Sequence, residues 1–169
     1  HIGQHRPEKG PFGGHFSQQS LVLELAERRA SQQKLTYTQE LMAARKDQKR
    51  RIKVSPNPAK KGQLVTVKAL AEHEMEPGVR MDPVTLIVYP RFILNQFICR
   101  YDGTKVFESD WYSGVSANPY LSFNLRAEKS GKIEIEWVDD YNSSTYAVTE
   151  LLVEDEALKD DGTSSDIAG

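Results

Sequence analysis

The feature that most constrains the fold is the alternation of side chains in KIEIEWVDD, residues 132–140. Its two isoleucines and its tryptophan fall on one face of an extended chain, and its two glutamates fall on the other. Apolar and charged residues that alternate with a period of two are typical of a strand with one buried face and one solvated face. The segment therefore predicts a strand of an antiparallel sheet.

Further short segments between residues 51 and 154 have the same character. They are LVTVKALA (64–71), VTLIVY (84–89), FILNQFICRY (92–101) and STYAVTELLVE (144–154). YDGTKVF (101–107) centres on Asp102-Gly103, a strong hairpin signal between two apolar runs. About seven or eight such strands, with turn residues between them and no helical pattern, predict an all-β fold. We expect an immunoglobulin-like antiparallel β-sandwich, with a small barrel as the alternative.

The N-terminal part of the chain differs from the rest. Residues 1–16 contain four glycines and two prolines, which predict an extended arm. Residues 17–50 have a helix-forming composition, with Ser17 and Ser20 as possible N-caps and Thr36 at a capping-box spacing. One bent helix or two short ones fit this helical extension equally well. Because its apolar stripe is narrow, such a helix needs a surface to dock on.

Charge is distributed unevenly along a chain whose net charge is −2. Residues 1–50 carry +4, residues 51–154 carry −2 and residues 155–169 carry −4. The last segment also contains glycine and serine, so we expect an acidic flexible tail. The small net charge gives no global field that would favour nucleic acid or an anionic membrane. A basic front and an acidic tail are typical of extensions that make contacts or are simply solvated.

Residue types suited to catalysis are sparse. Cys99 is the single cysteine, which excludes a disulfide within the chain and a thiolate metal cluster. It alternates in phase with Phe97 and Tyr101 in an apolar run, which favours a packed thiol over a reactive one. No phosphate-binding loop, dinucleotide fingerprint or nucleophile-elbow motif is present. We therefore expect no enzyme activity and no cofactor.

Weaker alternatives involve histidines, aspartates and basic residues. His1 could chelate copper through its amine and its ring, although a trimmed chain end is the simpler interpretation. The turn HEMEPGVR (73–80) combines a histidine, a methionine and carboxylates, but an exposed loop is the ordinary interpretation. Asp139 and Asp140 could bind a cation, but such residues more often end a strand and bond to its turn. The basic residues of the helical extension, Arg45 among them, fit a solvated helix face.

An ordered set of segments over residues 50–154 resembles the SoxZ family. The set comprises Arg-Ile-Lys-Val at 51–54, the His-x-Met-Glu-x-Gly-x-Arg turn at 73–80, Pro90-Arg91 before the apolar strand, Asn95, Phe97 and Cys99 within that strand, Ala117-Asn118-Pro119-Tyr120, and Trp137-x-Asp139-Asp140. These segments occur in the order of the family and at compatible spacing.

The resemblance implies an immunoglobulin-like sandwich and a role that is not catalytic. In that family SoxZ pairs with SoxY, which carries sulfur intermediates on a cysteine in a mobile Gly-Gly-Cys-Gly-Gly tail, and partner enzymes act on this tail in the periplasm. SoxZ commonly lacks a signal of its own and is thought to travel folded with its partner. The C-terminal tail of this chain has no cysteine, and Cys99 lies in a predicted strand. The resemblance therefore implies a periplasmic docking subunit rather than the sulfur carrier.

The resemblance stops before the helical extension. A basic, amphipathic extension suits the embrace of another subunit, so the alternative hypothesis is a SoxZ-like domain recruited as a structural subunit of a larger redox or photosynthetic complex. For partner contact we select residues near strand ends: Tyr89, Arg91, Phe92, Pro119 and Tyr120. Aromatic and arginine side chains are enriched at interface centres. Core packing is the alternative for each of them, and the stronger one for Phe92.

Overall fold

The computed structural model describes residues 17–155, and helix α1 comes first. The elements are α1 (Gln18–Ala44), the 3-10 turn η1 (Arg45–Asp47), β1 (Arg50–Ser55), β2 (Ala59–Lys60), β3 (Leu64–Ala71), β4 (Leu94–Tyr101), β5 (Thr104–Asp110), β6 (Tyr120–Arg126), β7 (Gly131–Asp139), β8 (Ser144–Leu151) and β9 (Val153–Glu154). The predicted arm at 1–16 lies outside the described residues, as does the predicted tail after Asp155.

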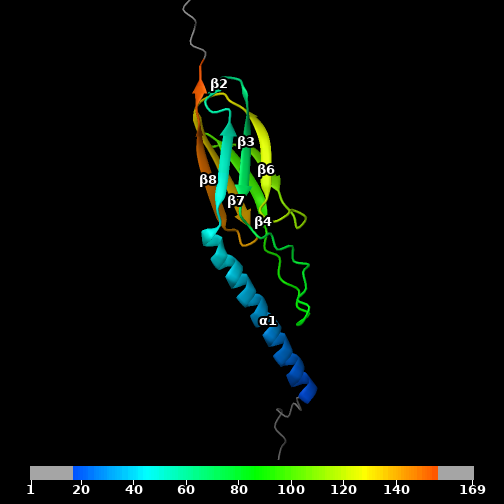
Figure 1. The fold of residues 1–169 in the computed structure, drawn as a ribbon. Helices are drawn as coiled ribbons and strands as arrows, with labels where there is room; N and C mark the ends of the chain where they lie inside the picture. The colour runs from blue at the N-terminus through cyan, green and yellow to red at the C-terminus, as the bar shows by residue number, and fades with distance from the viewer. Residues whose placement is uncertain (1–16, 156–169) are drawn as a thin grey trace, which may run out of the picture.

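Two antiparallel sheets form the body of the molecule (Figure 1). One has the strand order β1-β3-β6 and the other the order β5-β4-β7-β8, while β2 and β9 form a short parallel pair. The sheets share one core and are not closed into a barrel. The predicted mostly-β fold with a preceding helix is confirmed, and the immunoglobulin-like assignment stays a prediction.

Alternation along the strands selects the side chains that fill the space between the sheets. Ile133, Ile135 and Trp137 of the 132–140 segment are fully buried in β7, as the sequence predicts. Phe97 and Cys99 point inward from β4 and have no exposed surface. The ring of Phe97 stacks on Trp111 at 5.6 Å and meets Trp137 edge-on at 5.7 Å. Burial of such side chains stabilises the sandwich by roughly 25 cal/mol per Å² of apolar surface.

The hairpin between β4 and β5 follows its prediction. Asp102 and Gly103 both have positive φ angles, of 49° and 83°. This backbone geometry is the one that a two-residue hairpin turn requires. The hairpin places β5 at the edge of the four-stranded sheet.

The predicted strand at residues 84–89 is wrong. Residues 72–93 form a long loop between β3 and β4, with isolated bridges in place of a regular ladder. Asp82 accepts hydrogen bonds from the amides of Val84 and Thr85, both at 2.9 Å, and bends the chain into a turn. An apolar run becomes a strand only beside a partner strand, and this run has none among the described residues.

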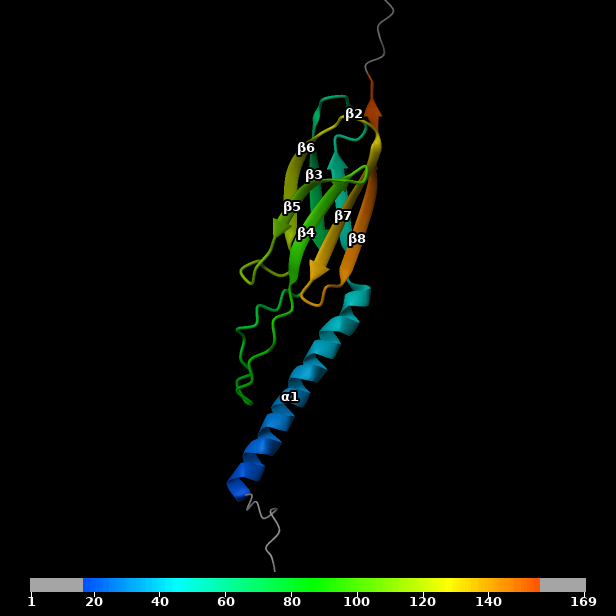
Figure 2. The ribbon, with the colours of Figure 1, turned by 180° about the vertical axis from the view of Figure 1, so that it is seen from behind.

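Helix α1 is a single element rather than two short ones. Ser17 is its N-cap and accepts a hydrogen bond from the Ser20 amide at 3.2 Å. Thr36 is not a cap, since its hydroxyl donates to the Gln32 carbonyl within the helix. The helix projects from one end of the sandwich, and β9 lies at the opposite end (Figures 1 and 2). In the part of the chain that the structure describes, no helix is long and apolar enough to cross a membrane.

Candidate functional site

The motifs singled out in the sequence meet at the end of the sandwich from which α1 projects. We call this group the junction cluster, and it consists of Tyr37, Arg45, His73, Glu76, Arg91, Phe92, Asn118, Asp139 and Asp140. Most of these residues lie in connections between strands or at strand ends, and Tyr37 and Arg45 belong to the helical segment. The antiparallel topology brings these connections together although they are far apart in sequence.

His73 is a buried member of the junction cluster, with only 3% of its surface exposed. Its amide donates to Asn118 Oδ1 at 3.0 Å, and the Asn118 amide donates to the His73 carbonyl at 2.8 Å. The ring Nδ1 accepts from the Met75 amide at 2.9 Å, and the ring centre lies 5.0 Å from that of Phe92. Burial, helped by two nearby guanidinium groups, lowers the pKa of His73 to about 4. The imidazole is therefore neutral at pH 7.

Glu76 connects the helix to the 72–93 loop. Its buried carboxylate accepts from the Tyr37 hydroxyl at 2.9 Å and from two Arg80 nitrogens at 3.0 and 3.2 Å. The Arg80 guanidinium lies 4.2 Å from the ring centre of Tyr89, and the rings of Tyr37 and Tyr89 are 4.4 Å apart. Burial, followed by the bond to Glu76, raises the pKa of Tyr37. The segment 73–80 is a loop, as predicted, but it is exposed only in part, because His73, Met75 and Glu76 are buried.

The two aspartates that follow Trp137, Asp139 and Asp140, have different hydrogen-bond partners. Asp140 binds Arg91 through two hydrogen bonds of 3.0 and 2.7 Å, the bidentate arrangement that a guanidinium favours. Asp139 accepts from the amides of Tyr141 and Ser143 at 2.9 and 3.1 Å. Asp139 therefore stabilises the turn after β7, as the sequence favours.

Arg45 connects the end of the helical segment to the sandwich. Its guanidinium lies 2.8 Å from the Asp139 carboxylate, an ion pair without hydrogen-bond alignment, and 5.5 Å from the Phe92 ring centre. Only 20% of the Arg45 side chain is exposed, so the prediction of a solvated face is wrong for this residue. Charge pairs with little solvent around them attract more strongly than surface pairs.

Gly78 allows the loop to approach the strand end closely. Its φ of 79° is a conformation that glycine adopts without strain. A Cβ atom at this position would lie 2.8 Å from the Cβ atom of Arg91. The loop can therefore follow its path only with glycine here.

The five residues selected for partner contact fall into two places. Tyr89 and Arg91 are engaged in the internal contacts described above, and Phe92 and Pro119 are buried. Burial of Phe92 agrees with core packing, its stronger interpretation, and Pro119 also follows the core-packing alternative. Tyr120 is 59% exposed and lies on β6, at the edge of the three-stranded sheet. Partner contact by any of the five stays a prediction.

The sequence did not predict the contact of Tyr37 with Glu76 or that of Asn118 with His73. Tyr37 and Glu76 lie 39 positions apart, and no periodicity links a helix to a loop over that distance. The sequence partly indicates a turn at Asn118, because asparagine tolerates a positive φ and is common in turns. Its φ is 51°.

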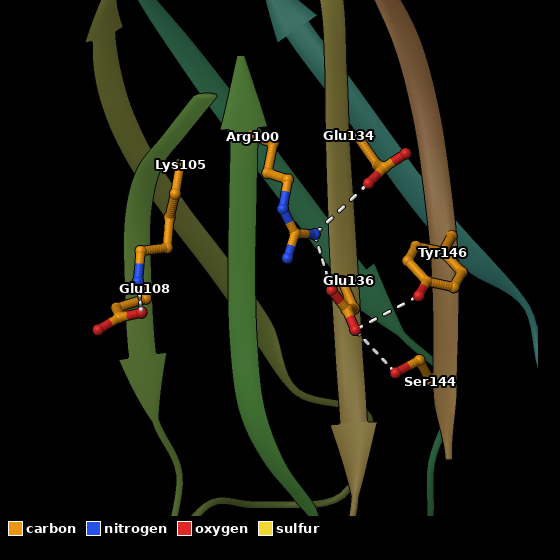
Figure 3. Close-up of polar contacts among 7 residues, drawn as sticks. All are labelled: Arg100, Lys105, Glu108, Glu134, Glu136, Ser144 and Tyr146. Carbon is orange, nitrogen blue, oxygen red and sulfur yellow. Dashed lines mark hydrogen bonds and ion pairs between the residues drawn. The ribbon is translucent and has the colours of Figure 1, made fainter. Parts of the chain in front are cut away.

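A second polar group lies on the outer face of the four-stranded sheet (Figure 3). Arg100 donates to Glu136 at 2.7 Å and lies 3.5 Å from Glu134. Ser144 and Tyr146 donate to the other oxygen of Glu136, at 2.8 and 3.4 Å. The bond to Arg100 is the main reason that the pKa of Glu136 is lowered. Charges on this face are thus balanced locally.

The described residues offer little for covalent or metal chemistry. Within residues 17–155 no group of three or more His, Cys, Asp or Glu side chains could hold a metal ion. Cys99 is free and buried, and burial raises the pKa of its thiol to about 12. The reactive thiolate is therefore scarce at neutral pH. His1, the candidate for copper, lies outside the described residues, so that possibility stays untested.

The junction cluster positions a helix and a loop that carry exposed apolar side chains among polar ones. We call helix α1 and residues 72–93 the helix–loop unit, and Figure 2 shows the two running side by side. The side-chain nitrogen Nε2 of Gln33 in the helix lies 3.5 Å from the hydroxyl oxygen of Thr85 in the loop. The exposed apolar side chains of this unit include Leu21, Val22, Leu23, Leu25, Leu35, Val79, Met81, Val84 and Leu86. Exposed apolar patches of this kind mark interaction sites.

Comparison with known proteins identifies a family for the sandwich. The family model of the sulphur oxidation protein SoxZ matches residues 52–150. Among curated proteins, no significant match occurs.

Solved structures give weaker likenesses. A superoxide reductase (neelaredoxin) variant from Ignicoccus hospitalis is 15% identical at a TM-score of 0.49, covering 67% of this chain and 86% of that one. The sulfur carrier protein SoxY from Chlorobium limicola f thiosulfatophilum is 17% identical at a TM-score of 0.41, covering 62% and 78%. These likenesses carry no argument about function. The family match spans more than half of the sequence, so the chain belongs to the SoxZ family.

Proposed function

We propose that the chain is a non-catalytic docking subunit, which binds a SoxY-like partner and helps to present the sulfur intermediates that this partner carries. The observation that carries the proposal is the set of exposed apolar side chains on the helix–loop unit. Helix α1 is 27 residues long and buries none of them. Helices of this kind gain most of their stability from a covered apolar face, and a partner subunit would supply the cover.

Family membership supports sulfur oxidation as the context of this partner. Cys99 is buried with a raised pKa, so the proposal assigns the covalent sulfur chemistry to the partner. An immunoglobulin-like sandwich and a periplasmic location belong to the same proposal and rest on the family alone. In this proposal Tyr89, Arg91 and Phe92 do not contact the partner, and their internal contacts hold the helix and the loop that do.

Reconstitution with a SoxY-like protein that bears a Gly-Gly-Cys tail tests the proposal. We expect a stable complex in size-exclusion chromatography and sulfur adducts on the partner's cysteine in mass spectrometry. Leu23→Glu should weaken the complex about tenfold or more, because a charge buried in an apolar interface costs more than about 1.4 kcal/mol.

Leu64→Glu is the matched control, since Leu64 is 56% exposed on β3, outside the helix–loop unit. This variant should bind as the unchanged chain does. If no SoxY-like partner forms a complex, or if both variants weaken it equally, the proposal is contradicted.

A second candidate function is favoured by the position of α1 outside the matched residues 52–150. In this alternative, a SoxZ-like domain serves as a structural subunit of a larger redox or photosynthetic complex and binds its host through the N-terminal segment. Deletion of residues 1–48 should release the chain from its native complex, while circular dichroism still reports a folded sandwich. Retention in the complex after this deletion would count against the alternative.

A further inference from the structure

The outer face of the three-stranded sheet carries a groove that the proposed function does not use. Its volume is about 640 Å³, and it extends across β1 and β3 to the edge strand β8. The lining residues are Arg50, Arg51, Ile52, Lys53, Lys68, Ala69, Leu70, Tyr120, Tyr146, Ala147 and Val148.

The charges in this groove are all of one sign. Lys53 of β1 and Lys68 of β3 are direct partners in the strand register, and like charges in that position destabilise a sheet. Neither lysine, nor Arg51 beside them, forms an ion pair within residues 17–155. No aspartate or glutamate lines the groove. This is the opposite of the four-stranded sheet, where Glu134 and Glu136 balance Arg100 (Figure 3).

The walls of the groove suit an extended peptide. Tyr120 and Tyr146 are 59% and 54% exposed, and Val148 is 51% exposed. Tyrosine side chains combine an apolar ring with a hydrogen-bonding hydroxyl, which makes them favourable interface residues. An anionic segment with some apolar character therefore matches the groove.

We propose that the groove binds the acidic C-terminal tail of the same chain, residues 155–169. This segment has a net charge of −4, with Asp160, Asp161 and Asp166 in its middle and end. Four cations line the groove without an ion pair among the described residues, Arg50 included, and they match the four net negative charges of the tail. The inference is independent of the proposed function.

The tail has the reach that this contact requires. Strand β8 lines the groove, and the short strand β9 connects it to the tail, so that Val148 precedes Asp155 by seven residues. A chain that turns back after β9 needs about 23 Å to return beside Val148, at about 3.3 Å per residue. Asp160 and Asp161 then lie close to the groove, and the segment after Asp155 spans up to roughly 46 Å.

A tethered tail binds even when each ion pair is weak. Tethering raises the local concentration of the tail to the millimolar range for a short flexible link. The charges are exposed, so salt weakens the contact: the screening length falls from about 10 Å at 0.1 M to about 3 Å at 1 M. A tail bound in this way covers the groove, and an acidic partner for the groove would have to displace it.

Zero-length carbodiimide cross-linking of the full chain tests the proposal. An equal mixture of ¹⁴N- and ¹⁵N-labelled chain is cross-linked at low salt, and the joined peptides are identified by mass spectrometry. We expect Lys53 and Lys68 to be joined to Asp160 or Asp161 in peptides of a single isotope, and the yield to fall at 1 M salt. Lys105, on the opposite sheet, is the control and should not be joined to the tail.

Each other outcome overturns the proposal. Joined peptides of mixed isotope would show that the tail of a second copy occupies the groove. Cross-links from the tail to Lys105 as often as to Lys53 would show a tail without a preferred site. The absence of any link to Lys53 and Lys68 would show that the tail does not reach them.

A second measurement does not depend on cross-linking yield. The variant D160N/D161N/D166N keeps the tail length and removes three charges outside the described fold. We expect its amide NMR spectrum to differ from that of the unchanged chain at residues 51–53, 68–70, 120 and 146–148. A spectrum that differs only within the tail would overturn the proposal.

Discussion

Phe97 of β4 has no exposed surface, and four aromatic rings surround it, those of Phe107, Trp111, Phe123 and Trp137. Leu23 of α1, by contrast, leaves 65% of its surface exposed. The sandwich is stabilised by apolar burial, and the 72–93 loop shares this burial through Met75, Phe92 and Ile93. Helix α1 buries no residue and is held by polar, aromatic and cation–π contacts at its C-terminal half. The helix is therefore the part that can lose its position while the sandwich remains folded.

The largest effect should come from the core. Phe97→Ala removes the ring at the centre of the aromatic cluster and should lower the free energy of unfolding by about 3–5 kcal/mol. Urea unfolding followed by tryptophan fluorescence measures this, since Trp111 and Trp137 both remain. Leu23→Ala is the matched control and should change stability by less than about 0.5 kcal/mol. If both variants lost the same free energy of unfolding, the sandwich core and the helix would contribute equally to stability, against this comparison.

Lowering the pH should destabilise the folded chain by protonating His73 in the junction cluster. The pKa of His73 is about 4 in the folded chain, against 6.5 for an ordinary histidine. The unfolded chain therefore takes up the proton first, so stability is complete above pH 6.5 and falls as the pH drops toward 4. The loss should reach roughly 3 kcal/mol at pH 4, because the pKa differs by about 2.5 units at about 1.4 kcal/mol per unit and the folded His73 is then half protonated.

Urea unfolding at pH 7 and pH 4 measures this loss. His73→Gln cannot titrate, and its stability should change less between the two pH values. If His73→Gln shows the same pH dependence as the unchanged chain, carboxylates rather than His73 are responsible.

The path of the 72–93 loop depends on Gly78. Gly78→Ala forces a strained φ and places a Cβ against Arg91, so we expect a loss of about 2 kcal/mol. Gly103 has a φ of 83° but nothing within 4 Å of the added Cβ. Gly103→Ala therefore shares the strain without the clash and should cost less. Thermal unfolding compares the two, and an equal cost would show that the close approach to Arg91 is unimportant.

The smallest effect concerns the bond between the helix and Glu76. Tyr37→Phe keeps the ring on Tyr89 and removes the hydroxyl donor, at a cost of about 1 kcal/mol for one hydrogen bond. Hydrogen exchange should accelerate in the second half of α1 and remain unchanged in β4 and β7. Tyr146→Phe is the control, because the Tyr146 hydroxyl bonds only at 3.4 Å on the outer sheet face. Acceleration across the strands would mean that the two regions unfold together.

Much of the sandwich could be predicted from local patterns. Alternation in 132–140 and 64–71 placed two strands almost at their observed bounds, and Asp102-Gly103 placed the hairpin. The strand at 84–89 failed because composition reports apolar character but does not report whether a partner strand is near. The prediction that Arg45 lies on a solvated face was also wrong, because a basic residue in a polar helix gives no sign of a distant buried aspartate.

By itself, the sequence determined several of the strands, their inward faces, the single cysteine and the family, because each depends on local periodicity or on ordered motifs. Only the tertiary structure decided that Glu76 meets Tyr37, that Asp139 meets Arg45, and that Tyr120 lines a basic groove. These contacts join residues from separate elements. The order of the strands in the two sheets determines which loops and strand ends lie next to each other. A long-range contact of one charge with another leaves no period in the chain, so the folded topology alone reveals it.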